Sequence, residues 1–88
     1  MEVSIWDTYV HKKDGEIMHF DIVVPSNVTD ETLVYEMGKE YLQSKGQEGQ
    51  ELSTEECRFC HKEIASEEVK ASIAQKGFYI IEMEGCDD

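Results

Sequence analysis

Two runs of alternating apolar and polar residues, joined by a short turn, constrain the fold of this 88-residue chain more than any other feature. The runs cover residues 3–10 and 17–24. Lys12–Gly15 lies between them, and Gly15 suits the positive φ that a tight turn often requires. Because side chains alternate between the two faces of a strand, the pattern predicts a β-hairpin with one apolar face.

The predicted register of this hairpin pairs Ile5 with Ile22 and Tyr9 with Met18. It gathers the large apolar side chains on one face: Val3, Ile5, Tyr9, Met18, Phe20, Ile22 and Val24. Asp7 falls on that apolar face, where a charge needs a partner or an opening to solvent. The opposite face is mixed and carries Trp6, Thr8, Val10, Ile17, His19, Asp21 and Val23.

An amphipathic helix is predicted after the hairpin. Thr29 is its expected N-cap, and it ends near Lys45 with Gly46 as the stop signal. Its apolar stripe consists of residues that recur at helical spacing: Leu33, Val34, Met37, Tyr41 and Leu42. Gly38 lies beside the stripe, where a missing side chain permits close approach to a strand.

A second helix is predicted between Ser66 as its cap and Gly77 as its end, with Val69 and Ile73 on its apolar stripe. Residues 78–83 follow and are apolar on both faces. That pattern is typical of a strand buried in the middle of a sheet.

Residues 57–64 allow two interpretations. As a strand, the segment places Cys57, Phe59 and His61 on one face and Cys60 and Ile64 on the other. As a helical turn opened by Ser53, with Glu56 at capping-box spacing, it gathers Cys57, Cys60 and His61. Its length favours a short turn around 54–56 followed by a strand.

The element order is therefore ββαβαβ, and the predicted fold class is α+β. We expect a two-layer sandwich in which two helices pack on a four-stranded mixed sheet, with 57–83 forming a right-handed crossover between parallel strands. Residues 1–88 form a single domain with a mobile loop at 46–52 and a tail at 85–88. The expected core consists of Ile5, Tyr9, Phe20, Ile22, Leu33, Met37, Tyr41, Phe59, Val69, Ile73, Ile80 and Ile81.

Charge excludes several classes of partner. With 20 acidic against 8 basic residues the net charge is −12, which repels nucleic acid and anionic membranes and is compatible with a protein partner or a homodimer. The start shows no signal-peptide pattern, and no apolar run approaches the roughly 20 residues of a membrane helix. These features predict a cytoplasmic protein, where three cysteines do not form a disulfide framework.

Cys57-Arg58-Phe59-Cys60-His61 is the first candidate site. A Cys-x-x-Cys-His segment can attach haem, contribute to a zinc site, act as a redox dithiol, or hold structural cysteines in a strand. Haem attachment lacks an export signal. Only the scattered residues Cys86, His11 and His19 can complete a zinc site with Cys57, Cys60 and His61. The structural interpretation is favoured, so no cofactor is expected, and zinc is the alternative.

Trp6, Asp7, His19 and Asp21 form the second candidate, a polar cluster on the hairpin. A His–Asp pair near a hydroxyl can take part in hydrolysis. His19 and Asp21 are two residues apart on one strand, so they stand side by side and do not converge on a nucleophile. A satisfied cross-strand pair is therefore expected over a catalytic one.

Four segments, taken together, resemble a family of short bacterial proteins known only as a domain of unknown function. They are Trp6-Asp7-Thr8-Tyr9-Val10, Met18-His19-Phe20-Asp21-Ile22, the Cys57–His61 segment and Tyr79-Ile80-Ile81-Glu82-Met83. The resemblance implies a small α+β domain and supplies no activity. The favoured function is a non-enzymatic binding or interaction module. The alternative is a metal- or thiol-dependent activity at Cys57, Cys60 and His61.

Overall fold

The computed structural model describes residues 1–86, so residues 87 and 88 of the predicted tail lie outside it. It has the predicted element order, ββαβαβ. The elements are β1 (Glu2–His11), β2 (Ile17–Pro25), α1 (Glu31–Ser44), β3 (Cys57–Ile64), α2 (Glu67–Lys76) and β4 (Tyr79–Glu84). The predicted α+β class, with four strands and two helices, is confirmed. Within residues 1–86, neither helix is long and apolar enough to cross a membrane.

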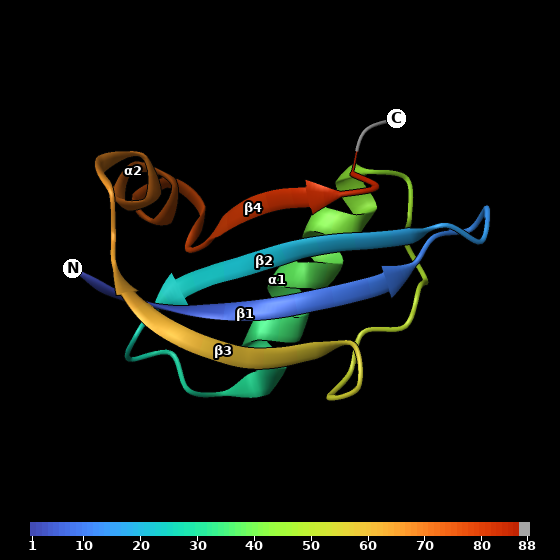
Figure 1. The fold of residues 1–88 in the computed structure, drawn as a ribbon. Coiled ribbons are helices and arrows are strands. Elements are labelled where there is room, and N and C mark those ends of the chain that lie inside the picture. The colour runs from blue at the N-terminus through green and yellow to red at the C-terminus, as the bar shows by residue number, and fades with distance from the viewer. Residues whose placement is uncertain (87–88) are drawn as a thin grey trace.

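The strands form one sheet in the order β3-β1-β2-β4, seen from bottom to top in Figure 1. Each neighbouring pair is antiparallel, so the prediction of a mixed sheet with a parallel crossover is wrong. The prediction that residues 78–83 form a central strand is also wrong, because β4 lies at an edge. Its two faces are both apolar because Phe78 and Ile80 pack toward α1 while Tyr79 and Ile81 pack toward α2.

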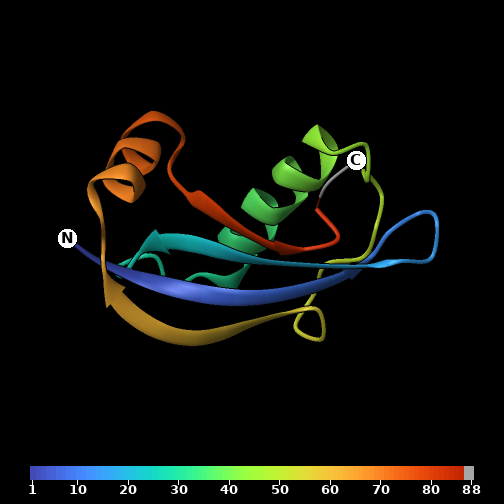
Figure 2. The same ribbon diagram turned by 45° about the horizontal axis from the view of Figure 1, so that its top comes forward.

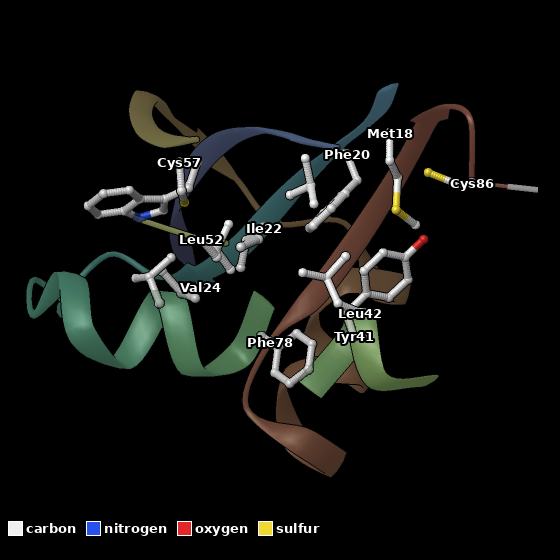
Figure 3. Close-up of a cluster of buried hydrophobic side chains, with 13 residues drawn as sticks. Met18, Phe20, Ile22, Val24, Tyr41, Leu42, Leu52, Cys57, Phe78 and Cys86 are labelled. Atoms are coloured by element: carbon white, nitrogen blue, oxygen red, sulfur yellow. The ribbon is translucent and has the colours of Figure 1, made fainter. Parts of the chain in front are cut away.

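The helices pack on opposite faces of the sheet, which corrects the two-layer prediction. Figure 1 shows α1 behind β1 and β2, and Figure 2 shows α2 at the end of the sheet near the N-terminus. The α1 face carries the larger core, with Phe20 and Ile22 fully buried (Figure 3). The α2 face carries a smaller core around Val3, Ile5 and Val23.

The hairpin forms as predicted, with Gly15 at a φ of 91°, but its register differs by one residue. Trp6 lies opposite Ile22, and Val10 lies opposite Met18. A shift of one residue moves every side chain of a strand to the other face. Trp6, Thr8 and Val10 therefore face α1, and Tyr9, predicted in the core, is 49% exposed.

The first helix begins one residue later than predicted, because Asp30 is its N-cap and accepts a hydrogen bond from the Thr32 backbone N–H. Its buried face includes Val34, Gly38 and Leu42, whereas Leu33, predicted in the core, is half exposed. The second helix has the predicted cap and end. Ser66 accepts from the Val69 N–H, and Gly77 has a φ of 90°.

Gly38 explains which face of α1 turns inward. A Cβ at this position would lie 2.4 Å from Leu52 Cδ2 and 2.9 Å from Ile22 Cδ1. The glycine therefore permits the predicted close approach to β2 and also admits Leu52, which is 5% exposed at the end of the loop predicted to be mobile.

Gly38→Val should lower the free energy of unfolding by about 1–3 kcal/mol, because the added methyl groups overpack the contact with Leu52 and Ile22. Urea unfolding followed by circular dichroism measures the change. The matched control is Glu40→Val on the exposed side of α1, which should cost only the helix propensity of about 0.5 kcal/mol. Equal costs at the two positions would contradict the close packing at Gly38.

Outside the strands and helices, a short turn leads into β3 and one core residue follows β4. The predicted short turn at 54–56 is present, with Ser53 N and Oγ both donating to Glu56 Oε1, and β3 follows directly. Cys86 is 4% exposed and joins the larger core, although the sequence placed it in a tail. Phe59, predicted in the core, is half exposed.

Candidate functional site

Asp7, His19 and Asp21 converge on the sheet face opposite α1. Asp7 and Asp21 lie directly across from each other on β1 and β2. His19 precedes Asp21 by two residues and therefore points to the same face. His19 Nε2 lies 2.6 Å from Asp7 Oδ1, and one ligand atom from each residue lies within 4.8 Å of the others. The hairpin alone thus assembles one imidazole and two carboxylates.

The position of α2 determines how exposed this cluster is. The helix covers only the end of this face where Val3, Ile5 and Val23 pack. The other half of the face, nearer the hairpin turn, has no helix over it (Figures 1 and 2). The cluster lies just beyond the apolar contact, so Asp21 is only 8% exposed while the Asp7 side chain is 38% exposed. The Asp21 carboxylate is therefore more deeply buried than the Asp7 carboxylate.

Asp21 is the electrostatically unusual member of the cluster. Burial, followed by the hydrogen bond and negative charge of Asp7, raises the pKa of Asp21 to about 6. Its Oδ1 atom is buried and has no hydrogen-bond partner. A buried, unpaired carboxylate oxygen beside a second carboxylate costs free energy unless a proton or a cation neutralises it. The cluster is therefore arranged to accept a positive charge.

Neighbouring side chains orient the cluster, and the charges of His19 and His61 only partly offset the rise in the pKa of Asp21. The Tyr9 ring stacks on His19 with centroids 4.0 Å apart and an interplanar angle of 11°. This contact restrains the rotation of the imidazole. Arg58 lies opposite Asp7 in the β1–β3 register, but its Nε donates to the Thr54 carbonyl oxygen.

Of the predicted polar cluster, the structure brings together Asp7, His19 and Asp21 and separates Trp6 from them. Trp6 lies on the α1 face, packs edge-on against Phe59, and has a buried Nε1 with no partner. The Thr8 hydroxyl is also on that face, where it donates to the Trp6 carbonyl and to Cys57 Sγ. The cluster thus has no adjacent Thr8 nucleophile, which disfavours the hydrolytic interpretation.

The Cys-x-x-Cys-His segment forms the predicted strand, but a bulge alters which side chains share a face. Ile5 lies opposite His61 and Trp6 opposite Phe59, which leaves Cys60 without a partner in β1. Cys57 is 1% exposed on the α1 face, whereas Cys60 is exposed. His61 lies on the opposite face from Cys57, although the sequence interpretation placed the two together.

The remaining predicted zinc ligands do not gather around this segment either. Cys86 is buried and its thiol donates to the His19 backbone carbonyl. His11 is exposed at the end of β1. Within residues 1–86, the group of potential metal ligands that converges is Asp7, His19 and Asp21, without a thiol. With the correct hairpin register, the sequence would have placed these three side chains on one face.

The fold and the site define a small α+β domain that presents a carboxylate–imidazole cluster on the half-open face of an antiparallel sheet. The model of a domain of unknown function, DUF2024, matches residues 1–83, and the chain belongs to this family. This confirms the resemblance seen in the sequence. A comparison with curated proteins gives no match.

One solved structure is similar over nearly the whole chain. It is the NMR structure of protein NE1680 from Nitrosomonas europaea, with 46% identity and a TM-score of 0.85. The match covers 99% of this chain and 100% of that one. The fold therefore recurs in a bacterial relative.

Proposed function

We propose that this domain is a binding module for a divalent first-row transition metal ion, with Asp7, His19 and Asp21 as the protein ligands. The observation that carries the proposal is the Asp21 Oδ1 atom, which is buried and unpartnered beside the Asp7 carboxylate. A dication there relieves the repulsion between the carboxylates and satisfies the orphaned oxygen together.

The spacing of the three side chains suits this role. Metal–ligand distances of about 2.0–2.2 Å place neighbouring ligand atoms roughly 3 Å apart. Asp7 Oδ1 and His19 Nε2 are now 2.6 Å apart, and the whole set lies within 4.8 Å. We expect small side-chain rotations to bring all three ligand atoms onto one ion.

The donor types indicate which ions fit. One imidazole with two carboxylates suits Zn²⁺, Mn²⁺, Fe²⁺ or Ni²⁺, whereas Ca²⁺ and Mg²⁺ prefer oxygen-only ligands. Three protein ligands leave coordination positions open on the solvent side, where Asp7 is partly exposed. Water or a small molecule can occupy those positions, which is compatible with a binding module.

Calorimetric titration with Zn²⁺ and Mn²⁺ tests the proposal, and we expect one site per chain with no comparable binding of Ca²⁺. Asp21→Asn removes a ligand and should weaken binding by at least about 100-fold, since even outer-shell changes cost 10–100-fold. Asp14→Asn, at an exposed position in the hairpin turn, is the matched control and should bind as the wild type does.

The exposed Cys60 and His61 are the competing candidate ligands for Zn²⁺, so His61→Gln separates the two possible sites. We expect His61→Gln to keep full affinity for both ions. Loss of binding in His61→Gln together with unchanged binding in Asp21→Asn would overturn the proposal.

A further inference from the structure

Cys60, His61 and Glu63 form a second polar cluster on β3. It shares no residue with the Asp7–His19–Asp21 site, although His61 lies close enough to lower the pKa of Asp21. Cys60 Sγ lies 3.1 Å from His61 Nδ1, and His61 Nε2 is hydrogen-bonded to Glu63 Oε2. All three side chains are exposed. A thiol, an imidazole and a carboxylate in this order are the parts of an activated sulfur nucleophile.

The β-bulge produces this contact. In a regular strand Cys60 and His61 point to opposite faces and cannot touch. Because the bulge leaves Cys60 without a partner residue in β1, it redirects the side chain, as bulges beside functional sites do. The thiol therefore remains in solvent and in contact with the imidazole.

The hydrogen bonds favour the tautomer that a base needs. The Glu63 carboxylate only accepts, so the neutral His61 ring donates its Nε2–H to Glu63. The lone pair then resides on Nδ1, which faces Cys60 Sγ. His61 is thus oriented to take the thiol proton.

The other two thiols lack these features. Cys57 is 1% exposed and accepts a hydrogen bond from the Thr8 hydroxyl, and burial raises the pKa of its thiol. Cys86 is also buried and donates to the His19 carbonyl. Among the three cysteines, Cys60 alone can meet a dissolved reagent.

We infer that Cys60 is a thiol modification site that forms a mixed disulfide with a low-molecular-weight disulfide such as oxidised glutathione. His61 Nδ1 takes the proton of the Cys60 thiol, and Sγ attacks one sulfur of the reagent. The disulfide bond of the reagent breaks as the new bond forms. The leaving thiolate takes the proton from His61, so Cys60 is oxidised and half of the reagent is reduced to a free thiol.

The uncharged disulfide dithiodipyridine tests this inference at neutral pH, because its reaction is unaffected by the net charge of the protein. We expect one fast thiol in the native wild type and two more only after denaturation. Cys60→Ser should remove the fast phase. His61→Gln should slow it about tenfold or more, since the base is lost. His11→Gln is the matched control and should leave it unchanged.

Mass spectrometry after incubation with oxidised glutathione should locate a single adduct on Cys60. The inference is overturned if Cys60 reacts no faster than free cysteine, or if His61→Gln leaves the rate unchanged. A fast phase that persists in Cys60→Ser would also overturn it. Neither assay involves a metal ion, so the outcome is independent of the proposed metal site.

Discussion

Asp21→Asn should raise the free energy of unfolding of the metal-free protein at pH 8 by on the order of 2 kcal/mol. Asp21 is 8% exposed and its pKa is raised to about 6. Asparagine keeps the size of the side chain, removes the buried charge and can donate a hydrogen bond to Asp7. The substitution that removes a proposed metal ligand is therefore expected to stabilise the fold.

The stabilisation by Asp21→Asn should depend on pH in one direction. The pKa of Asp21 is about 6 in the folded chain, against 3.8 for an unperturbed aspartate side chain. Between these values the folded state holds the proton that the unfolded state has released, so wild-type stability falls as pH rises. The advantage of Asp21→Asn should grow from about pH 4 to pH 6 and then remain constant.

Urea unfolding of both proteins in chelator across this pH range measures the difference. Asp14→Asn again serves as the matched control and should show no such trend. A constant difference at all pH values, or a less stable variant at pH 8, would contradict the raised pKa and the unpaired state of Asp21.

Phe20→Ala should lower the free energy of unfolding by about 3–5 kcal/mol, which is among the largest effects expected of any single substitution. Phe20 has no exposed surface, and its ring centroid lies 4.7 Å from that of Tyr41 on α1 (Figure 3). Truncation leaves a cavity between the sheet and α1 that neither element can close.

Urea unfolding at neutral pH measures this loss, and Phe59→Ala is the matched control. Both residues were predicted in the core, but Phe59 is half exposed on edge strand β3. Its truncation should cost no more than about 1.5 kcal/mol, mainly the contact with Trp6. Similar losses in the two variants would contradict the placement of β3 at the edge of the sheet.

Features that depend on neighbouring residues could be predicted from the sequence. Ser66 and Gly77 bound the second helix as expected, and Gly15 forms the hairpin turn. The Ser53–Glu56 turn before β3 was also correct. Each of these features depends on hydrogen bonds or backbone angles within a few residues. The residue types at those positions therefore predict the feature directly.

Features that depend on distant contacts were predicted less well. The two-sided apolar pattern of residues 78–83 suggested a central strand, but an edge strand has the same pattern when helices cover both of its faces. Because of the bulge at Cys60, His61 lies on the opposite sheet face from Cys57 and not on the same face as predicted. The bulge arises from pairing with β1, which the β3 sequence alone does not contain.

For the candidate site, too, the residues were identified from the sequence but their spatial arrangement was not. Asp7, His19 and Asp21 were recognised as unusual polar residues, but the predicted register placed Asp7 on the opposite face from the other two. In either register Met18 and Ile22 have apolar partners. The partners are Tyr9 and Ile5 in the predicted register, and Val10 and Trp6 in the observed one. The residue types therefore could not distinguish the two registers. The true register assembles the cluster, and it also removes Trp6 from it.

X-ray absorption spectroscopy of the protein loaded with one equivalent of Zn²⁺ tests the metal site most directly, because it identifies the atoms bound to the ion. We predict a first shell of nitrogen and oxygen at about 2.0–2.2 Å, from His19, Asp7, Asp21 and solvent. The spectrum should lose its imidazole contribution in His19→Gln and keep it in His61→Gln. A sulfur neighbour at about 2.3 Å would place the ion at a cysteine and contradict the account.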